Sequence, residues 1–173
     1  MNEWQEGILS DVAEIVMGQS PSGDTCNENH EGLPLLNGPT EFGYSSPTPV
    51  QYTTDPKRIA SPDDLLFCVR GSTTGRMNWA QQEYAIGRGL AAIHHKNGSE
   101  YRFFLKAIID YYLPYLLTSA TGSTFPNVSR DQISKLKVNI PPLSEQKEIS
   151  DFFAAISLKI ELNQRMNELV SLN

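Results

Sequence analysis

A glycine-hinged stretch in the middle of the chain carries side chains that suit contact with DNA. Residues 70–76 read Arg-Gly-Ser-Thr-Thr-Gly-Arg, and further polar residues follow up to position 88. An Arg guanidinium can donate two hydrogen bonds to a guanine edge, Asn and Gln can pair with adenine, and hydroxyls can hold phosphates. We therefore predict DNA-facing roles for Arg70, Ser72, Thr73, Thr74, Arg76, Asn78 and Arg88. The alternative is that each Arg forms a surface ion pair and each Gly a turn.

Polar loops elsewhere supply a second group of candidate DNA-facing residues. They lie in the Gly-Gln-Ser-Pro stretch at 18–21, in the basic pair at 57–58 and in the loop at 122–127. The members of this group are Gln19, Ser20, Lys57, Arg58 and Thr124.

The same loops lack the spacing of familiar catalytic sites. Residues 70–76 do not follow the GxxxxGK[ST] pattern of a nucleotide-binding loop. Pro62-Asp63 resembles the start of a nuclease motif, but no Glu-x-Lys follows at a fitting distance. His94 and His95 are adjacent, so on a strand they point to opposite faces. We therefore expect a non-catalytic chain that binds no metal ion or cofactor itself.

The charges are distributed unevenly along a chain whose net charge is −6. Residues 1–52 contain eight acids and no Lys or Arg, whereas residues 53–106 contain eight bases and five acids. The basic middle can face a polyanion although the whole protein is acidic. A solvated surface of mixed charge is the alternative.

The composition suits one globular domain outside the membrane. The 173 residues are 39% hydrophobic and 20% charged, enough for one core. No run approaches the roughly 18 to 20 apolar residues of a membrane span, and the start lacks a signal-peptide pattern. The two cysteines, Cys26 and Cys68, do not suggest a disulfide framework. We therefore expect a cytoplasmic protein.

The pattern up to residue 143 predicts a mixed α+β domain of short elements. Pro114 is expected to end or kink the helix that begins at Tyr101. Strands are expected at Leu33–Leu36, Val50–Thr53, Leu65–Val69, Leu90–Ile93 and Lys137–Ile140, and helices at Tyr101–Tyr112 and from about Arg130. The sequence thus divides into a globular DNA-recognition domain at 1–143 and one long helix at 144–173.

The last thirty residues contain neither Pro nor Gly and predict that long helix. Ser144 is expected to cap its start, and residues 145–172 would span about 42 Å. Seam positions recur in steps of four and three: Ile149, Phe153, Ile156, Ile160, Asn163, Asn167 and Val170. This spacing is typical of a coiled coil and predicts dimerisation through the helix. The alternative is a helix docked along its whole length on its own domain.

Several segments together resemble the specificity subunit of type I restriction-modification enzymes. The C-terminal stretch at 140–149, which leads into residues 159–164 (KIELNQ), is the most specific, because it resembles the family's entry into a spacer helix. The segments are LSDVAEI at 9–15, GQSP at 18–21, DLLF at 64–67 with Gly71 and Gly75, IGRGLAAI at 86–93, GSTF at 122–125 with NVS at 127–129, and IPPLSEQKEI at 140–149.

The resemblance implies a target-recognition domain that reads one half of a bipartite site in double-stranded DNA, followed by a spacer helix. Members usually carry two of each, so this chain corresponds to a natural half-subunit or to a fragment. Two copies paired through the helix, as a homodimer, would restore the usual arrangement. The implied partners are methyltransferase subunits that use S-adenosylmethionine and a restriction subunit, a translocase, that uses ATP and Mg²⁺.

Two other classes of protein remain open at this point. The first is a DNA-independent scaffold or adaptor whose C-terminal helix recruits a methyltransferase, a role that the acidic residues 1–52 would suit. The second is a site-specific nuclease, which would need a cluster of metal-binding carboxylates that the sequence does not assemble.

Overall fold

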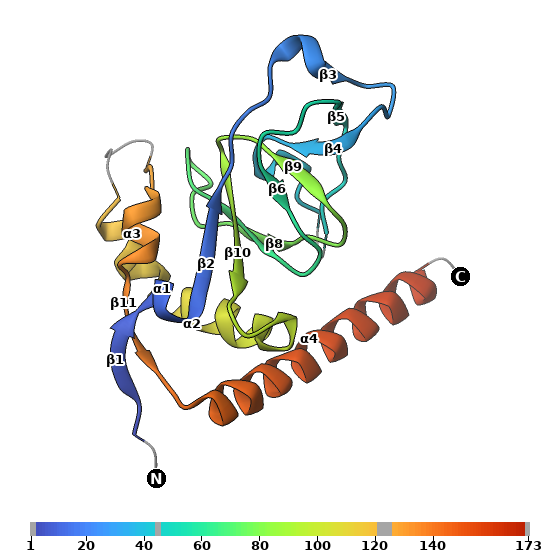
Figure 1. Ribbon diagram of the computed structural model, residues 1–173. Helices are drawn as coiled ribbons and strands as arrows, with labels where there is room; N and C mark the ends of the chain where they lie inside the picture. Colours follow the sequence, from blue (N-terminus) through green and yellow to red (C-terminus); the bar gives the residue numbers. More distant parts are fainter. Residues whose placement is uncertain (1–2, 44–45, 121–125, 172–173) are drawn as a thin grey trace.

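The computed structural model describes residues 3–43, 46–120 and 126–171, which form a layered domain and one projecting helix (Figure 1). In this part of the chain a four-stranded antiparallel sheet lies at the centre. Its strands, in spatial order, are β2 (Ala13–Met17), β10 (Leu90–His95), β7 (Leu65–Cys68) and β8 (Met77–Trp79). The mixed α+β class predicted from the sequence is confirmed.

A second sheet packs against the first. Its strands, in spatial order, are β3 (Cys26–Asn27), β5 (Gln51–Thr53), β4 (Leu33–Leu36), β9 (Tyr84–Ile86) and β6 (Ile59–Ala60). The pair β4 and β9 is parallel and the other pairs are antiparallel. Single helical turns of the 3-10 type lie at Gly23–Thr25, Pro39–Glu41 and Ser99–Tyr101.

Helices cover the other face of the central sheet. The main one is α2 (Arg102–Thr118), with the short α1 (Leu9–Val12) and α3 (Arg130–Ser134) beside it. A two-stranded ribbon of β1 (Gln5–Ile8) and β11 (Lys137–Ile140) then leads the chain into α4 (Leu143–Ser171).

The apolar run at β7 is buried on both faces. Leu65 and Phe67 belong to the core that includes Phe104 and Ile109 of α2. Leu66, one residue out of phase, belongs to the core between the two sheets. Successive strand side chains point to opposite faces, so a strand covered on both sides is apolar throughout.

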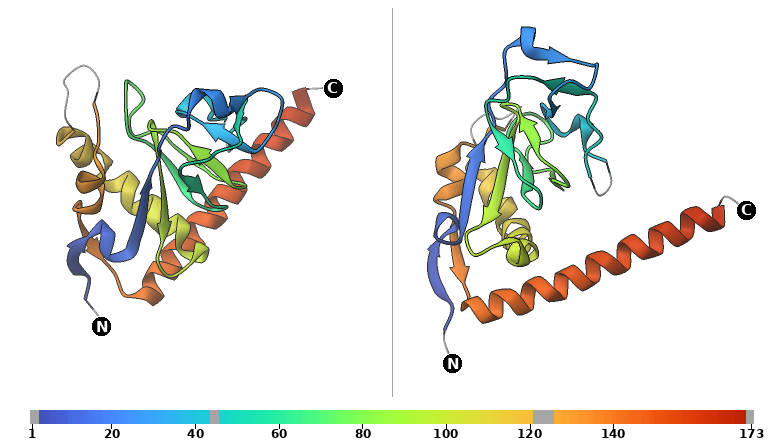
Figure 2. Two further views of the ribbon diagram at one scale, coloured as in Figure 1. Left: turned by 45° about the horizontal axis from the view of Figure 1, so that its top comes forward. Right: turned by 45° about the vertical axis from the view of Figure 1, so that its right-hand side comes forward.

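Helix α4 docks on the domain only through its first turns. Figure 2 shows it leaving the domain and projecting to one side. Ile149 packs against the core between the central sheet and α2, whereas Phe152 is 62% exposed and Leu158 56% exposed. The predicted alternative of a helix docked along its whole length is therefore wrong.

Two expected helix boundaries differ from the structure. Pro114 does not end α2, which continues to Thr118. The proline lies on an exposed position, and Asp110, whose carbonyl loses its N–H partner, is an exposed residue too. Ser144 is not the cap of α4, because the helix begins at Leu143 and the N–H of Gln146 already donates to the Pro142 carbonyl oxygen, 3.0 Å away.

Candidate nucleic-acid interface

Chain segments that are far apart in the sequence meet at one end of the central sheet. Strands β2 and β7 finish there and β10 begins there, because β10 is antiparallel to both. Gln19 follows β2, Arg70 follows β7 and Arg88 precedes β10. Arg76 precedes β8 at the same end, with its carbonyl oxygen 2.8 Å from the N–H of Cys68. The topology therefore brings together most of the residues predicted to face DNA.

The loop between β7 and β8 is a tight hairpin held by its own backbone. The N–H of Gly75 donates to the Cys68 carbonyl oxygen at 2.9 Å, and that of Arg76 to the Thr73 carbonyl oxygen at 3.0 Å. Gly71 and Gly75 have φ of 86° and 93°, a left-handed conformation that favours glycine. These two turns fix the directions in which Arg70 and Arg76 leave the sheet.

A second segment supports this hairpin from the side. The Thr74 hydroxyl lies 2.8 Å from the carbonyl oxygens of Gly71 and Pro126, and the Gly71 N–H donates to the Pro126 oxygen at 3.2 Å. Arg70 also forms an isolated bridge with Asn127. The predicted loop at 122–127 thus reaches the hairpin through its described residues, while Thr124 lies outside the described residues.

The loops at 18–20 and 87–89 are in backbone contact. The Gly18 N–H donates to the Leu90 carbonyl oxygen at 2.8 Å, and a Cβ at Gly18 would lie 2.1 Å from the Gly87 oxygen. The Ser20 hydroxyl accepts the backbone N–H of Arg88 at 3.4 Å. This close approach is what places Ser20 beside Arg88.

The guanidiniums at this end of the sheet differ in pairing from Lys57, Arg102 and Lys106 of the basic middle. Among the described residues, no carboxylate forms an ion pair with Arg70, Arg76 or Arg88, and all three are exposed. Arg102, by contrast, binds Asp63 at 2.6 Å, and Lys106 binds Asp110 at 2.5 Å. Exposed guanidiniums without a carboxylate partner are suited to phosphates or guanine edges.

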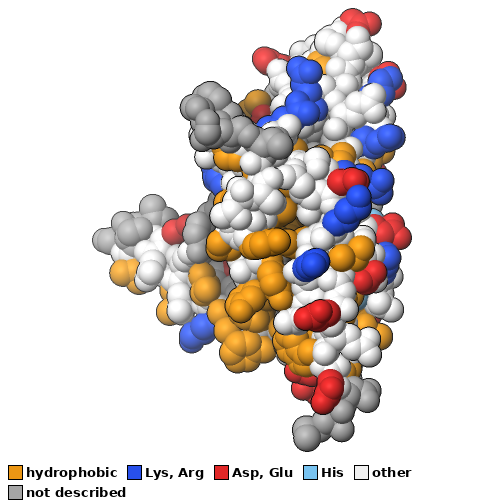
Figure 3. Space-filling model, turned by 90° about the vertical axis from the view of Figure 1, so that its left-hand side faces the viewer, with side chains coloured by type: hydrophobic (Ala, Val, Ile, Leu, Met, Phe, Trp, Pro, Cys, Tyr) orange, Lys and Arg blue, Asp and Glu red, His pale blue; other side chains and the backbone are white. Residues whose placement is uncertain are grey.

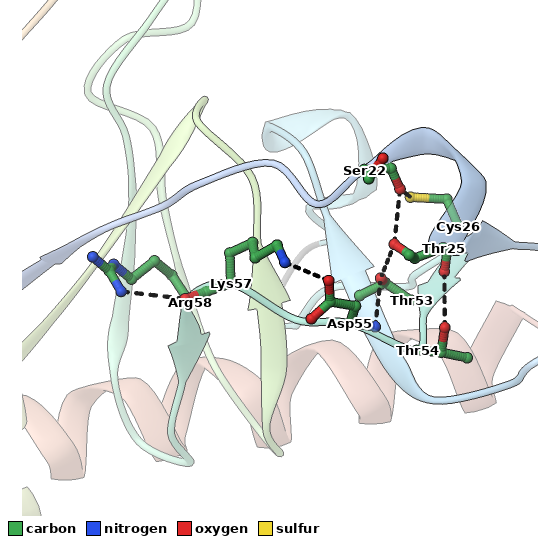
Figure 4. A network of polar contacts seen from close by, with 8 residues as sticks. All are labelled: Ser22, Thr25, Cys26, Thr53, Thr54, Asp55, Lys57 and Arg58. Carbon is green, nitrogen blue, oxygen red and sulfur yellow. Dashed lines mark hydrogen bonds and ion pairs between the residues drawn. The ribbon is translucent and has the colours of Figure 1, made fainter.

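Lys57 and Arg58 lie at the edge of the second sheet and point in different directions (Figure 4). The Lys57 ammonium forms an ion pair with Asp55, in a network that continues through Thr53 to Thr25. The Arg58 guanidinium points away from that network, and the Arg58 carbonyl oxygen accepts the N–H of Ile86 at 2.9 Å. Arg58 is therefore the more accessible of the two to a polyanion.

Asn78 does not have the accessible position that the sequence interpretation required. Its side chain is 6% exposed, and its amide donates to the Gly43 carbonyl oxygen at 3.1 Å. Its amide oxygen accepts the N–H of Trp79 at 2.7 Å. Asn78 lies within β8 rather than in the loop before it, so its side chain is used to hold the fold.

Two amides that were not predicted join the site. Asn37 follows β4 and donates from Nδ2 to Oε1 of Gln51 at 3.1 Å. A Cβ at Gly87 would lie 2.5 Å from Oδ1 of Asn37, so the pair stands against the loop that carries Arg88. The signal in the sequence was an Asn directly after a predicted strand and before Gly38, a position that reads equally well as a turn.

The first residue of the predicted α4 seam packs on the domain, and the other seam residues are exposed. Ile149 packs on its own core, and Phe153, Ile156 and Ile160 are 39%, 39% and 46% exposed. The remaining seam positions, Asn163, Asn167 and Val170, are also exposed.

Figure 3 shows one face of the molecule with most of its Lys and Arg side chains in the upper half and apolar side chains in the lower half. Exposed aromatic residues of the domain include Tyr111 and Tyr115 of α2 and Trp4.

Within the described ranges no group of three or more His, Cys, Asp or Glu residues could hold a metal ion. No described helix is both long and apolar enough to cross a bilayer.

Comparison with known proteins identifies relatives of the whole chain. A 156-residue stretch is 35% identical to the protein described as the type I restriction enzyme MjaX specificity subunit of Methanocaldococcus jannaschii, covering 90% of this chain and 36% of that protein. The HsdS subunit from Thermoanaerobacter tengcongensis superposes with a TM-score of 0.77 at 31% identity, over 96% of this chain and 40% of that one.

A chain from a structural study of complex assembly and conformational transition in the type I R-M system is similar. Its TM-score is 0.78 at 32% identity, over 98% of this chain and 42% of that one. The chain described here thus spans well under half the length of these relatives. Residues 1–172 match the family of type I restriction modification DNA specificity domains. With its fold and its basic loop cluster, this chain therefore belongs to the type I restriction-modification DNA specificity domain family.

Proposed function

We propose that this chain reads one half of a bipartite site in double-stranded DNA. The supporting observation is the convergence of Arg70, Arg76 and Arg88, exposed and without an ion pair to a described carboxylate, at one end of the central sheet. Guanidiniums there can read guanine edges, while Gln19 and the Asn37 and Gln51 amides can read adenine. The Ser20 and Ser72 hydroxyls supply phosphate contacts.

Helix α4 serves in this proposal as the spacer between two half-sites. At 1.5 Å per residue its 29 residues span about 43 Å, against about 34 Å for one turn of B-DNA. Two copies paired antiparallel through Ile156 and Ile160 would place identical recognition domains at opposite ends. Such a homodimer reads an inverted, symmetric sequence.

A second apolar stripe on α4 supports docking of partner subunits. Leu158, Leu162 and Leu169 are 56%, 47% and 64% exposed and lie more than 100° around the helix from the middle of the predicted seam, at 100° per residue. A helix that is apolar on two faces is suited to a bundle of more than two helices. We assign this stripe to methyltransferase subunits, which would supply methyl transfer from S-adenosylmethionine, as a restriction subunit would supply ATP-driven cleavage.

The proposal is tested with the chain alone and mixed with a methyltransferase subunit of the same restriction-modification system. Mass photometry is expected to show a dimer alone and a 2:2 complex with the methyltransferase. The complex is expected to methylate a symmetric bipartite site selected from a random DNA library. A monomeric chain that binds no methyltransferase would contradict the proposal.

The scaffold alternative is separated by the double variant Arg70→Ala with Arg76→Ala. We expect this variant to form the same complex and to lose site-selective methylation. Lys137→Ala, which removes one exposed charge from the ribbon at the other end of the domain, is the control and is expected to behave as wild type. Unchanged methylation by the double variant would favour a scaffold that does not read DNA.

A further inference from the structure

A chain of buried polar contacts joins α4 to the recognition domain at the end of β10 opposite the arginines. Nδ1 of His95 accepts the backbone N–H of Asn97 at 3.1 Å. Nδ1 is therefore the unprotonated nitrogen, and Nε2–H donates to Oε1 of Gln146 at 2.9 Å. The Gln146 amide donates in turn to the Pro141 carbonyl oxygen at 2.8 Å. His95 and Gln146 are each 4% exposed.

The two ends of this contact are themselves held in place. The His95 ring stacks on Tyr101, with ring centroids 4.8 Å apart, and meets the edge of Phe104 at 6.0 Å. One turn further along α4, the Ser150 hydroxyl donates to the Glu100 carbonyl oxygen at 2.6 Å. Gln146 and Ser150 are four residues apart and share one face of the helix. The helix is thus attached at two points, to the last residue of β10 and to the segment that follows it.

Apolar packing beside these contacts is incomplete. A pocket of about 490 Å³ that opens to solvent lies between α2 and the start of α4, lined by residues that include Phe104, Tyr111, Ile149 and Phe153. Apolar contact is non-directional, whereas hydrogen bonds weaken steeply when their angles change. The direction of α4 is therefore determined more by the hydrogen bonds than by the apolar contacts.

Small changes in that direction are amplified at the far end of the helix. The 21 residues after Ser150 extend about 31 Å beyond the second attachment point. A tilt of about 6° moves the tip by about 3.3 Å, close to the rise of one DNA base pair. A spacer helix that distinguishes spacings one base pair apart needs an attachment held at least this firmly.

We propose that His95 and Gln146 are positioning residues that set the direction of α4 and thereby the number of base pairs between two half-sites. The inference rests on the proposed function, in which α4 is the spacer. It assigns the choice of spacing to a buried contact within one chain, remote from the DNA-facing loops. Neither residue touches DNA or the reacting groups.

The test uses full-length variants that separate positioning from folding. Gln146→Leu leaves the His95 N–H unpaired. The double variant His95→Phe with Gln146→Leu replaces both partners by apolar groups of similar shape, so no imidazole N–H is left unpaired. The Asn97 N–H and the Pro141 carbonyl oxygen also lose their side-chain partners, so urea unfolding of each variant is measured alongside. Glu148→Gln, an exposed change in the same turns of α4, is the matched control. Each variant is assayed with the methyltransferase on sites whose spacers differ by one base pair.

We expect wild type and Glu148→Gln to prefer one spacer length. The double variant is expected to keep its half-site preference and complex formation while its discrimination between adjacent spacers falls about tenfold, as loss of one buried hydrogen bond allows. Unchanged spacer discrimination in the double variant would overturn the inference. Loss of half-site preference together with spacer choice would also overturn it, since the contact would then support the whole fold.

A distance measurement on the free chain makes the result independent of the proposed function. Spin labels are placed at Glu83→Cys and Gln164→Cys in a Cys26→Ser background, diluted with unlabelled chain. We expect a narrow electron–electron distance distribution for wild type that broadens in the double variant. Absence of any spacer preference in wild type refutes the proposed function, and the distances then decide whether the contact orients α4. Equal distributions in both proteins refute the positioning role itself.

Discussion

The backbone N–H of Val69 donates to the carbonyl oxygen of Gly89, 2.9 Å away. This bond joins the chain just beyond β7 to the chain just before β10, so Arg70 and Arg88 emerge side by side from the end of the central sheet. Their separation is thus set by sheet pairing rather than by loop conformation. A pair of arginines held in this way can address neighbouring base pairs or phosphates without reordering of the backbone, so only the side chains have to be ordered on binding.

Arg88→Ala is expected to relax base preference in the half-site. If the guanidinium reads a guanine edge, its loss costs about 1–3 kcal/mol of discrimination at one position. Site selection from a random DNA library by the complex with the methyltransferase measures this directly. The control Lys137→Ala should select the same sequence as wild type. A uniform loss of affinity without a change of preferred bases would reassign Arg88 to a phosphate contact.

Gly18→Ala is expected to destabilise the protein and to disturb the interface. The new methyl group would lie 2.1 Å from the Gly87 carbonyl oxygen, so backbone has to move in the loop that carries Arg88. Overpacking of this kind costs about 1–3 kcal/mol. Urea unfolding and DNA binding are both measured. Gly23→Ala, where a Cβ meets nothing within 4 Å, is the control. Equal stability of the two variants would contradict the close approach of the two loops.

Stability is expected to fall below neutral pH because of His95. Burial lowers the pKa of His95 from its ordinary value of 6.5, and the hydrogen bond to Gln146 offsets only part of this effect. The unfolded chain therefore gains a proton near pH 6.5 before the folded chain does. The free energy of unfolding should decrease as pH falls below 6.5, by at most about 1.4 kcal/mol per unit, and level off below the folded pKa.

The measurement is urea unfolding at several pH values between about 5 and 7.5, a range chosen around the histidine pKa. His95→Phe removes the titrating group and should show a shallower pH dependence over the same range. Identical slopes for wild type and His95→Phe would contradict a buried neutral imidazole.

Ile156→Asp with Ile160→Asp is expected to convert a dimer into monomers. Both side chains are exposed on the free part of α4, and carboxylates at a helix seam would be buried without partners. Sedimentation velocity at micromolar concentration distinguishes the two states. Ala155→Asp adds a carboxylate at an exposed position more than 100° around the helix from the middle of the seam and should remain dimeric. A wild-type protein that sediments as a monomer would refute pairing through this seam.

Local patterns were sufficient for most elements of the fold. The Leu33–Leu36 strand and the Lys137–Ile140 strand are confirmed residue for residue. The helix expected from about Arg130 begins there, because Ser129 and Gln132 cap its start through their side chains. The expected end of α2 at Pro114 was wrong, because the effect of the proline depends on whether the lost hydrogen bond is exposed, which only the packing of α2 determines.

The sequence was sufficient to predict which types of residue form the candidate site, but not which individual residues belong to it. Arg70, Arg76 and Arg88 were singled out from loop composition, and the structure brings them together. Asn78 was singled out for the hydrogen-bonding capacity of its amide, but it is buried. It is the second residue of β8 and does not lie in the loop before the strand. Asn37 was missed because nothing in the local sequence relates it to Gly87, fifty residues later.

The sequence by itself determined the class of fold, the long C-terminal helix and the family, because these depend on local periodicity, breakers and motif order. Only the tertiary structure decided which loops meet and how α4 leaves the domain. Those features arise from pairing between distant strands and from single buried contacts such as that of His95 with Gln146. Contacts of this kind leave no periodic signal, since each partner obeys only the pattern of its own element.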